Sequence, residues 1–186
     1  MTMPAQLSLM IQRNAAIHAD ALGTAFGARR RNWGEAAERI ARIAGGLKAL
    51  GLTEGDRVAM LALNSDRYFE FFFAVSWAGM VFTPINIRLA PPEFVHWLSD
   101  SGARALIVDD AFAKVVPAIA PQLPDLETLI FAGDGEAPEG MTLFESLAEH
   151  PAADPSARGG DDMAGLFYTG GTTGLSKGVM LSHGNI

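Results

Sequence analysis

The sequence has no cysteine, and this absence excludes several kinds of chemistry at once. Disulfide bonds, thiolate metal sites and cysteine nucleophiles all require that side chain. The absence fits a reducing compartment, so we expect a cytoplasmic location. Basic residues are also few, because 14 Lys and Arg stand against 21 Asp and Glu and give a net charge of −7. A general nucleic-acid-binding protein needs a basic face, so no nucleic-acid partner is expected.

Apolar runs of membrane-spanning length are absent as well. The most apolar stretch, FFFAVSWAGMVFTPI, covers residues 71–85. It is shorter than the ~20 residues that a spanning helix needs, and it contains a proline near its end. The first residues, MTMPAQLSLMIQR, have no basic segment ahead of an apolar core and do not resemble a secretory signal. We therefore expect no transmembrane segment and interpret residues 71–85 as a buried helix that runs into a buried strand.

The amounts of apolar and charged residues are those of a folded domain. Hydrophobic residues make up 49% of the chain and charged residues 19%, which is enough for a buried core. Apolar runs alternate with helical patterns along most of the chain. The predicted strands cover residues 57–63, 81–85, 104–108, 126–132 and 163–169, and the predicted helices between them cover 66–78, 91–99 and 111–120. This alternation predicts an α/β fold with a mostly parallel sheet flanked by helices.

A further helix is predicted after residue 32. Asn32 and Glu35 have the spacing of a capping box, and Gly51 is placed to end the helix. The two glycines inside it, Gly45 and Gly46, should each cost about 1 kcal/mol relative to alanine. Close packing against a neighbouring segment would explain why they are there.

Charged residues in the same region suggest local pairs. Residues 24–26 and those after Arg29 are predicted to form a hairpin around Gly27, and the run RRR at 29–31 is interpreted as a solvated turn. Glu35–Arg39 and Glu38–Arg42 have the i,i+4 spacing of helical ion pairs.

Residues 133–162 differ in composition from the rest. They are rich in Gly, Pro and acidic residues around one weakly helical patch, MTLFESLAEH. Such a composition indicates a surface loop or a connector.

A glycine-rich stretch follows the last predicted strand. Residues 168–178 read YTGGTTGLSKG. Glycines let backbone N–H groups approach an anion, threonines add hydroxyl donors and a lysine adds a compact positive charge, which together suit a phosphate group. A flexible turn is the plain alternative, but the order of the residues and the flanking strands favour a phosphate loop.

Two well-known nucleotide motifs do not match this stretch. In the P-loop pattern G-x-x-x-x-G-K-[ST], Ser176 stands in place of the second glycine and Gly178 in place of the Ser or Thr. The dinucleotide pattern G-x-G-x-x-G has no match in residues 168–178.

The longer segment FYTGGTTGLSKGVMLSHGN resembles the signature of the adenylate-forming superfamily, which includes acyl-CoA synthetases, luciferase-type enzymes and the adenylation domains of peptide synthetases. The usual form reads YTSGTTGxPKG, so the chain departs from it at Gly170 and Ser176. Upstream, residues 86–89 and 92–93 match a stretch typical of fatty-acid and aryl acyl-CoA ligases. The likeness covers most of residues 30–186.

The resemblance implies that residues 1–186 are an incomplete AMP-binding domain, part of the large N-terminal domain of an adenylate-forming enzyme. The last residues, SHGNI, end where Ser182 would begin a helix, so we expect a piece of a longer protein. The ribose-binding aspartate, the magnesium-binding carboxylate and the catalytic lysine of the family are expected beyond residue 186. No catalytic residue is therefore expected in this chain, and the chain alone should be inactive.

The resemblance also implies the substrates and their contacts. A carboxylic acid, fatty or another organic acid, would be activated with ATP and Mg²⁺ and then joined to coenzyme A, as in a long-chain-fatty-acid–CoA ligase. The ATP phosphates would contact the loop, and Thr169 would also help to hold magnesium. The implied phosphate-binding residues are Thr169, Gly170, Gly171, Thr172, Thr173, Gly174 and Lys177.

Other interpretations stay open at this point. The same fold serves amino-acid adenylation, and a nucleotide-binding or partner-binding piece without catalysis is a third option. The acyl substrate and the oligomeric state, including a homodimer, cannot be chosen from the sequence.

Several polar and aromatic residues have plainer interpretations. His183 is expected to cap or pack, and Asp109 and Asp110 are expected to begin a solvated helix. Trp77 and Trp97 are expected in the core. His18, His96 and His150 lack metal-ligand spacing.

Overall fold

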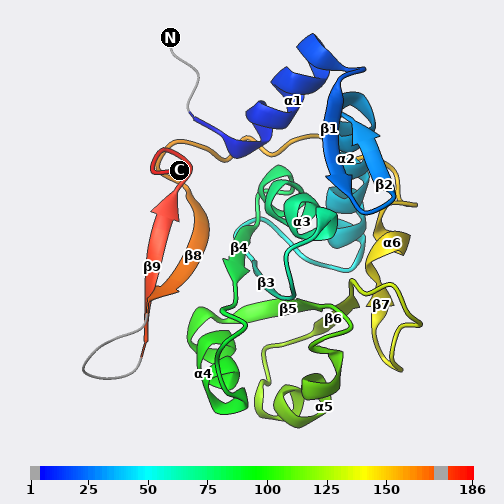
Figure 1. The fold of residues 1–186 in the computed structure, drawn as a ribbon. Helices are drawn as coiled ribbons and strands as arrows, with labels where there is room; N and C mark the ends of the chain where they lie inside the picture. The colour runs from blue at the N-terminus through cyan, green and yellow to red at the C-terminus, as the bar shows by residue number, and fades with distance from the viewer. Residues whose placement is uncertain (1–4, 170–175) are drawn as a thin grey trace.

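The computed structural model describes residues 5–169 and 176–186. Its centre is a seven-stranded sheet with the order β7-β6-β5-β3-β4-β8-β9, shown in Figure 1. All neighbouring strands in it run parallel except β8 and β9, which are antiparallel. The strands are β3 (Arg57–Leu61), β4 (Val81–Pro84), β5 (Ala103–Val108), β6 (Thr128–Phe131), β7 (Thr142–Leu143), β8 (Met163–Thr169) and β9 (Lys177–Ser182). The predicted mostly parallel α/β sheet is confirmed.

Helices cover both faces of this sheet. One face packs against α1 (Leu7–His18), α2 (Trp33–Ala49), α3 (Asp66–Trp77) and α6 (Phe144–Leu147), and the other against α4 (Pro91–Ser101) and α5 (Val116–Ile119). Strand β3 shows the alternation, because Val58 and Met60 belong to the first core while Ala59 and Leu61 belong to the second. In the described residues, no helix has both the length and the apolar character needed to cross a membrane.

The helix predicted after residue 32 is confirmed in detail. Asn32 accepts a hydrogen bond from the Glu35 N–H at 2.8 Å, and the Glu35 side chain accepts one from the Asn32 N–H at 2.9 Å. Gly51, just beyond the helix, has a φ of +87°, a conformation that favours glycine. Gly45 and Gly46 lie against another segment, because an added Cβ would be 2.1 Å from a carbonyl oxygen at Gly45 and 2.7 Å from a backbone atom at Gly46.

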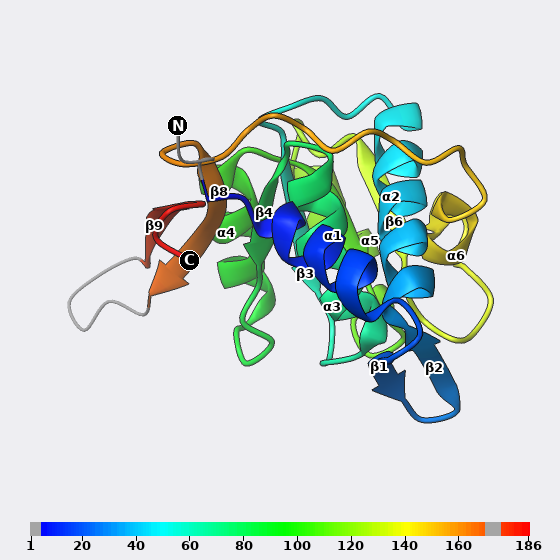
Figure 2. The ribbon, with the colours of Figure 1, turned by 90° about the horizontal axis from the view of Figure 1, so that it is seen from above.

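The hairpin at the start of the chain is also confirmed, with β1 (Leu22–Phe26) antiparallel to β2 (Arg29–Asn32). Seen from above, it projects beside α2 (Figure 2). The interpretation of residues 29–31 as a solvated turn is wrong. These residues form β2, and both Arg29 and Arg31 reach the carboxylate of Asp66 in α3, at 2.9 and 3.0 Å. The side chain of Asp66 is only 1% exposed, so the two arginines balance a buried charge.

One of the two predicted ion pairs in α2 is wrong. Arg42 does pair with Glu38 at 2.7 Å. Arg39 instead contacts Glu70 at 2.8 Å and Glu145 at 2.7 Å, while Glu35 is used in the helix cap. The buried carboxylate of Glu70, 2% exposed, needs a charged partner more than a solvated side chain does.

Two other helices differ from their predicted bounds. The helix predicted for residues 111–120 is broken into η1 (Ala113–Val115), α5 and η2 (Ala120–Gln122). Pro117 and Pro121 explain the breaks, since each lacks the N–H that a continuous helix requires. Helix α4 continues to Ser101, two residues beyond its predicted end, and Gly102 then ends it with a φ of +60°.

Residues 133–162 attach to the body at several points. Strand β7 pairs with β6 at the sheet edge, and Phe144 and Leu147 of α6 are fully buried in the core on the α2 side. Farther along, the indole N–H of Trp77 donates to the carbonyl of Ala153 at 2.8 Å. Trp77 and Trp97 are both buried, as predicted.

Candidate functional site

Strands β8 and β9 bring two predicted site residues face to face. Thr169 ends β8, Lys177 begins β9, and the two residues are paired across the antiparallel ladder. Strand β8 runs parallel to β4, so Thr169 lies at the edge where the parallel strands end. Ligands of open α/β sheets bind at that edge. Both residues are exposed, and Figure 1 shows their hairpin at one side of the molecule.

The other predicted phosphate-binding residues, Gly170, Gly171, Thr172, Thr173 and Gly174, lie outside the described residues. Their contacts therefore stay predictions. The structure places the two strand ends on either side of them, at Thr169 and Lys177.

The placed pair has the chemistry for an anion. Lysine is a compact cation with three donors, and threonine adds a hydroxyl. Paired residues of neighbouring strands lie about 5 Å apart, so one phosphate group is within reach of both.

The donor set gives only limited support for magnesium. Within residues 5–169 and 176–186, no group of three or more His, Asp or Glu side chains is arranged to hold a metal ion. The Thr169 hydroxyl is the type of oxygen ligand that Mg²⁺ accepts, so this part of the chain offers Mg²⁺ a hydroxyl and the phosphates would bring further oxygens.

The end of the hairpin that carries Thr169 and Lys177 packs against α4. The rings of Trp97 and Tyr168 stack with centroids 4.7 Å apart and planes 20° apart. The Tyr168 hydroxyl donates to Asp100 Oδ2 at 2.6 Å, and His96 Nε2 lies 3.4 Å from the carbonyl oxygen of Ser176. Burial, together with the hydrogen bond to Asp100, raises the pKa of Tyr168 well above its ordinary value. The hydroxyl therefore keeps its proton and remains a donor.

Sequence reasoning missed this contact. Trp97 was expected only as a core residue, and Asp100 was not singled out. The signal that was available is the position of Trp97 and Asp100 three residues apart, which puts both on one face of a helix.

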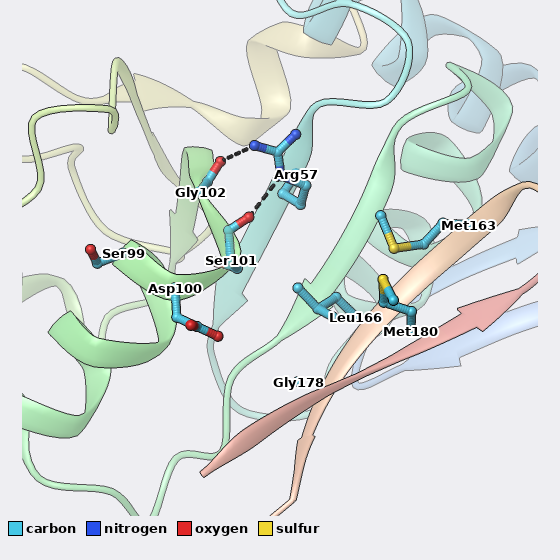
Figure 3. A pocket seen from close by; sticks show the side chains of 9 residues that line it. All are labelled: Arg57, Ser99, Asp100, Ser101, Gly102, Met163, Leu166, Gly178 and Met180. Atoms are coloured by element: carbon cyan, nitrogen blue, oxygen red, sulfur yellow. Dashed lines mark hydrogen bonds between the residues drawn. The ribbon is translucent and has the colours of Figure 1, made fainter. Parts of the chain in front are cut away.

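A pocket of about 480 Å³ opens between α4 and the hairpin (Figure 3). The end of α4 forms its polar wall, where the guanidinium of Arg57 donates to the carbonyls of Ser101 and Gly102, each at 2.7 Å. Met163 and Met180 of the hairpin form the apolar wall. Because the guanidinium of Arg57 already donates to these carbonyls, we do not interpret the pocket as an anion-binding site.

His183 is a packing residue, as predicted. It is 4% exposed, and its Nδ1 accepts a hydrogen bond from the Leu7 N–H at 3.4 Å. Burial lowers the pKa of His183, so the ring stays neutral at neutral pH and can accept that bond.

The two aspartates after β5 are held by backbone groups. Asp109 accepts hydrogen bonds from the N–H groups of Leu63 at 2.8 Å and Ala111 at 3.0 Å. Asp110 accepts one from the Asp134 N–H at 2.8 Å. Only the Ala111 contact is local, and η1 begins later, at Ala113. The expected solvated helix start is therefore wrong, because both carboxylates hold neighbouring segments of the chain instead.

Known proteins resemble this chain over most of its length. A family model described as "AMP-binding enzyme" matches residues 11–186. A feruloyl-CoA synthase of Amycolatopsis sp is 38% identical over 178 residues, which are 94% of this chain and 33% of that protein. A long-chain-fatty-acid–CoA ligase of Thermus thermophilus is 39% identical over 155 residues, 83% of this chain and 28% of that protein. The chain thus spans about a third of the length of these relatives.

A solved structure shows the same fold. The anthranilate CoA ligase AuaEII, in complex with anthranoyl-AMP, superposes with a TM-score of 0.92 and 27% sequence identity. The match covers 99% of this chain and 36% of that protein.

Proposed function

Because the chain belongs to the AMP-binding enzyme family, we propose that its full-length parent activates a carboxylic acid with ATP and then forms a thioester with coenzyme A. In the first step a carboxylate oxygen attacks the α-phosphorus, and pyrophosphate leaves. In the second step the thiol of coenzyme A attacks the acyl carbon, AMP leaves, and the thiol gives up its proton. The chain would form the N-terminal part of the parent's AMP-binding domain.

The pairing of Thr169 with Lys177 at the carboxyl-terminal edge of the sheet carries this proposal. The negative charge on the leaving pyrophosphate increases as the first step proceeds. Positioned donors and a cation stabilise such charge without a protein nucleophile. Thr169 and Lys177 would supply a hydroxyl and an ammonium group, and Gly170, Gly171, Thr172, Thr173 and Gly174 would supply amides and hydroxyls between them.

Magnesium would enter with the ATP phosphates, and Thr169 would be one of its oxygen ligands. The ion would neutralise phosphate charge. The side chain of Thr169 would then have a second role beside its hydrogen bond to the phosphates.

The acid is proposed at the level of class. The relatives are named for ferulate and for long-chain fatty acids, and the solved structure for anthranilate. These acids are organic and differ widely in shape, so we propose a fatty or other organic acid. The proposal includes a cytoplasmic location for the parent.

The decisive variant is Lys177→Ala in the full-length parent. The measurement is the exchange of labelled pyrophosphate into ATP in the presence of the acid. We expect exchange to fall at least about tenfold, because a charged hydrogen-bond donor to the leaving group is lost. The matched control is Lys114→Ala, which removes an exposed lysine from η1 and should leave exchange unchanged.

Equal melting temperatures of the two variants would show that both fold. Unchanged exchange in folded Lys177→Ala would contradict the proposal. A panel of carboxylic acids, with thioester formation on coenzyme A as the second readout, separates an acyl-CoA ligase from an enzyme that stops at the adenylate.

A further inference from the structure

Strand pairing holds the distal half of the β8–β9 hairpin weakly. Strand β9 is the last strand of the sheet and has β8 as its strand neighbour. Strand β8 in turn pairs with β4 through Phe82 and Gly165, four residues before Thr169. From Leu166 onward the hairpin therefore extends beyond its pairing with β4, and another element must fix its direction.

Helix α4 contacts both arms of that distal half. On the first arm, Tyr168 stacks on Trp97 and donates its hydroxyl to Asp100. On the second arm, the carbonyl oxygen of Ser176 lies 3.4 Å from His96 Nε2. Tyr168 directly precedes Thr169 in the chain, and Ser176 directly precedes Lys177. Thr169 and Lys177 are thus each one peptide unit from a residue that contacts α4.

The two contacts of Tyr168 complement each other geometrically. The stacked indole of Trp97 fixes the plane of the phenol ring, and the carboxylate of Asp100 fixes the direction of its hydroxyl. Because both the ring and the hydroxyl of Tyr168 are held, the backbone of Tyr168 is fixed as well. The peptide bond that leads to Thr169 is then fixed with it. Because side chains alternate along a strand, Thr169 then points away from the α4 face.

Asp100 is an unfavourable residue for the place it occupies. It lies in the last turn of α4, where the helix dipole disfavours negative charge. The short hydrogen bond from Tyr168 offsets this cost. A residue that breaks a local rule while making a specific long-range contact is a candidate for a functional role.

We propose that His96, Trp97 and Asp100 are positioning residues that hold Thr169 and Lys177 within reach of the phosphate chain. This proposal rests on the proposed function of the hairpin. The three side chains act through Tyr168 and Ser176 and do not themselves touch the nucleotide.

The test uses two variants of the full-length parent at the contact between α4 and the first arm. Tyr168→Phe keeps the stacked ring and removes the hydroxyl, and Asp100→Ala removes the acceptor. Each should raise the KM for ATP about tenfold, since a displacement of about 1 Å is enough to cost that much or more. The KM for the acid and the melting temperature should stay unchanged, because the change is local.

Two controls separate positioning from a general structural role. Asp100→Asn keeps an oxygen acceptor for the Tyr168 hydroxyl and should restore most of the ATP affinity that Asp100→Ala loses. Ser99→Ala alters the neighbouring exposed residue of the same helix and should behave like the unaltered enzyme. The dissociation constant of ATP, measured by calorimetry without the acid, should follow the same order as KM.

The outcomes distinguish this proposal from the one on which it rests. If Lys177→Ala weakens exchange while Tyr168→Phe and Asp100→Ala bind ATP normally, the positioning role is wrong and the function stands. If Lys177→Ala has no effect either, the function itself is wrong. If Asp100→Asn is as impaired as Asp100→Ala, or if both variants melt at a lower temperature, the contact is structural and the positioning role is rejected.

Discussion

Gly46 is a glycine because of a contact with a segment that is distant in the sequence. Its place in the middle of α2 is locally unfavourable, and a Cβ there would lie 2.7 Å from the backbone of Leu147. Gly45 is in the same situation against Pro151. The sequence predicted that something packs closely here. It could not predict which segment does, because the partner lies about a hundred residues away and helical periodicity carries no information about it.

Replacing Gly46 by alanine should therefore destabilise the chain even though alanine is the better helix former. We expect a loss of about 1–3 kcal/mol, the usual cost of overpacking, measured as a lower urea midpoint. The control is Gly34→Ala in the first turn of the same helix, where the nearest atom to a Cβ would be 3.3 Å away. That variant should stay within about 1 kcal/mol. A stabilising Gly46→Ala would contradict the close packing.

At the scale of elements, ion pairs attach the β1–β2 hairpin to α3. Arg29 and Arg31 of β2 converge on Asp66, and Arg31 also lies 3.4 Å from Glu70. Sequence patterns predicted the hairpin, its turn glycine and the cap of α2, because each depends on residues within a few positions. They did not predict the ion pairs with α3, because a run of arginines has the same sequence whether it faces solvent or a buried carboxylate.

Asp66→Asn tests this attachment. The change leaves two arginines without their buried partner, so we expect a loss of about 2–3 kcal/mol, between the values for exposed and fully buried pairs. Amide hydrogen exchange should increase first in residues 22–32. The control is Glu38→Gln, which breaks the exposed pair with Arg42 and should change stability by about 0.5 kcal/mol or less. Equal effects of the two variants would mean that the hairpin is held by other contacts.

The break in the helix predicted for residues 111–120 shows a different limit. The predicted range contains Pro117, and Pro121 follows directly after it. The structure follows the prolines, because a missing N–H and a ring clash act at every occurrence. A stricter use of the same local rule would have found the break.

At the scale of the whole molecule, buried and half-buried carboxylates make stability depend on pH. Burial alone would raise the pKa of Asp66, but the hydrogen bonds and charges of Arg29 and Arg31 outweigh it and hold the pKa below 3.8. In the same way, Arg67 and Arg39 outweigh burial and hold the pKa of Glu145 below 4.5. In the unfolded chain both groups return to those ordinary values.

The pKa of Glu70 shifts in the opposite direction, because burial outweighs the effect of Arg39 and raises it. The contribution of Glu70 to stability is therefore present at low pH and is lost as the pH rises through its folded pKa. The carboxylates with a lowered pKa outnumber it, because hydrogen bonds from Arg67 and Arg29 also lower the pKa of Asp134.

The expected result is a stability that falls on acidification. As the pH decreases through about 4.5, the unfolded chain binds protons before Asp66 and Glu145 do in the folded chain. The urea midpoint should therefore decrease between about pH 6 and about pH 3. Asp66→Asn should show a shallower decrease, because it removes one of the groups responsible. A midpoint that stays constant or increases over this range would contradict the assigned shifts.

The exposed position of Lys177 at the start of β9 has a practical consequence for chemical footprinting. The chain has three lysines, Lys48, Lys114 and Lys177, and all three are exposed on different elements. A reagent that acetylates amines should modify each of them in the free protein. A bound triphosphate would shield Lys177 and leave the other two reactive, so peptide masses would report occupancy at one lysine against two internal references.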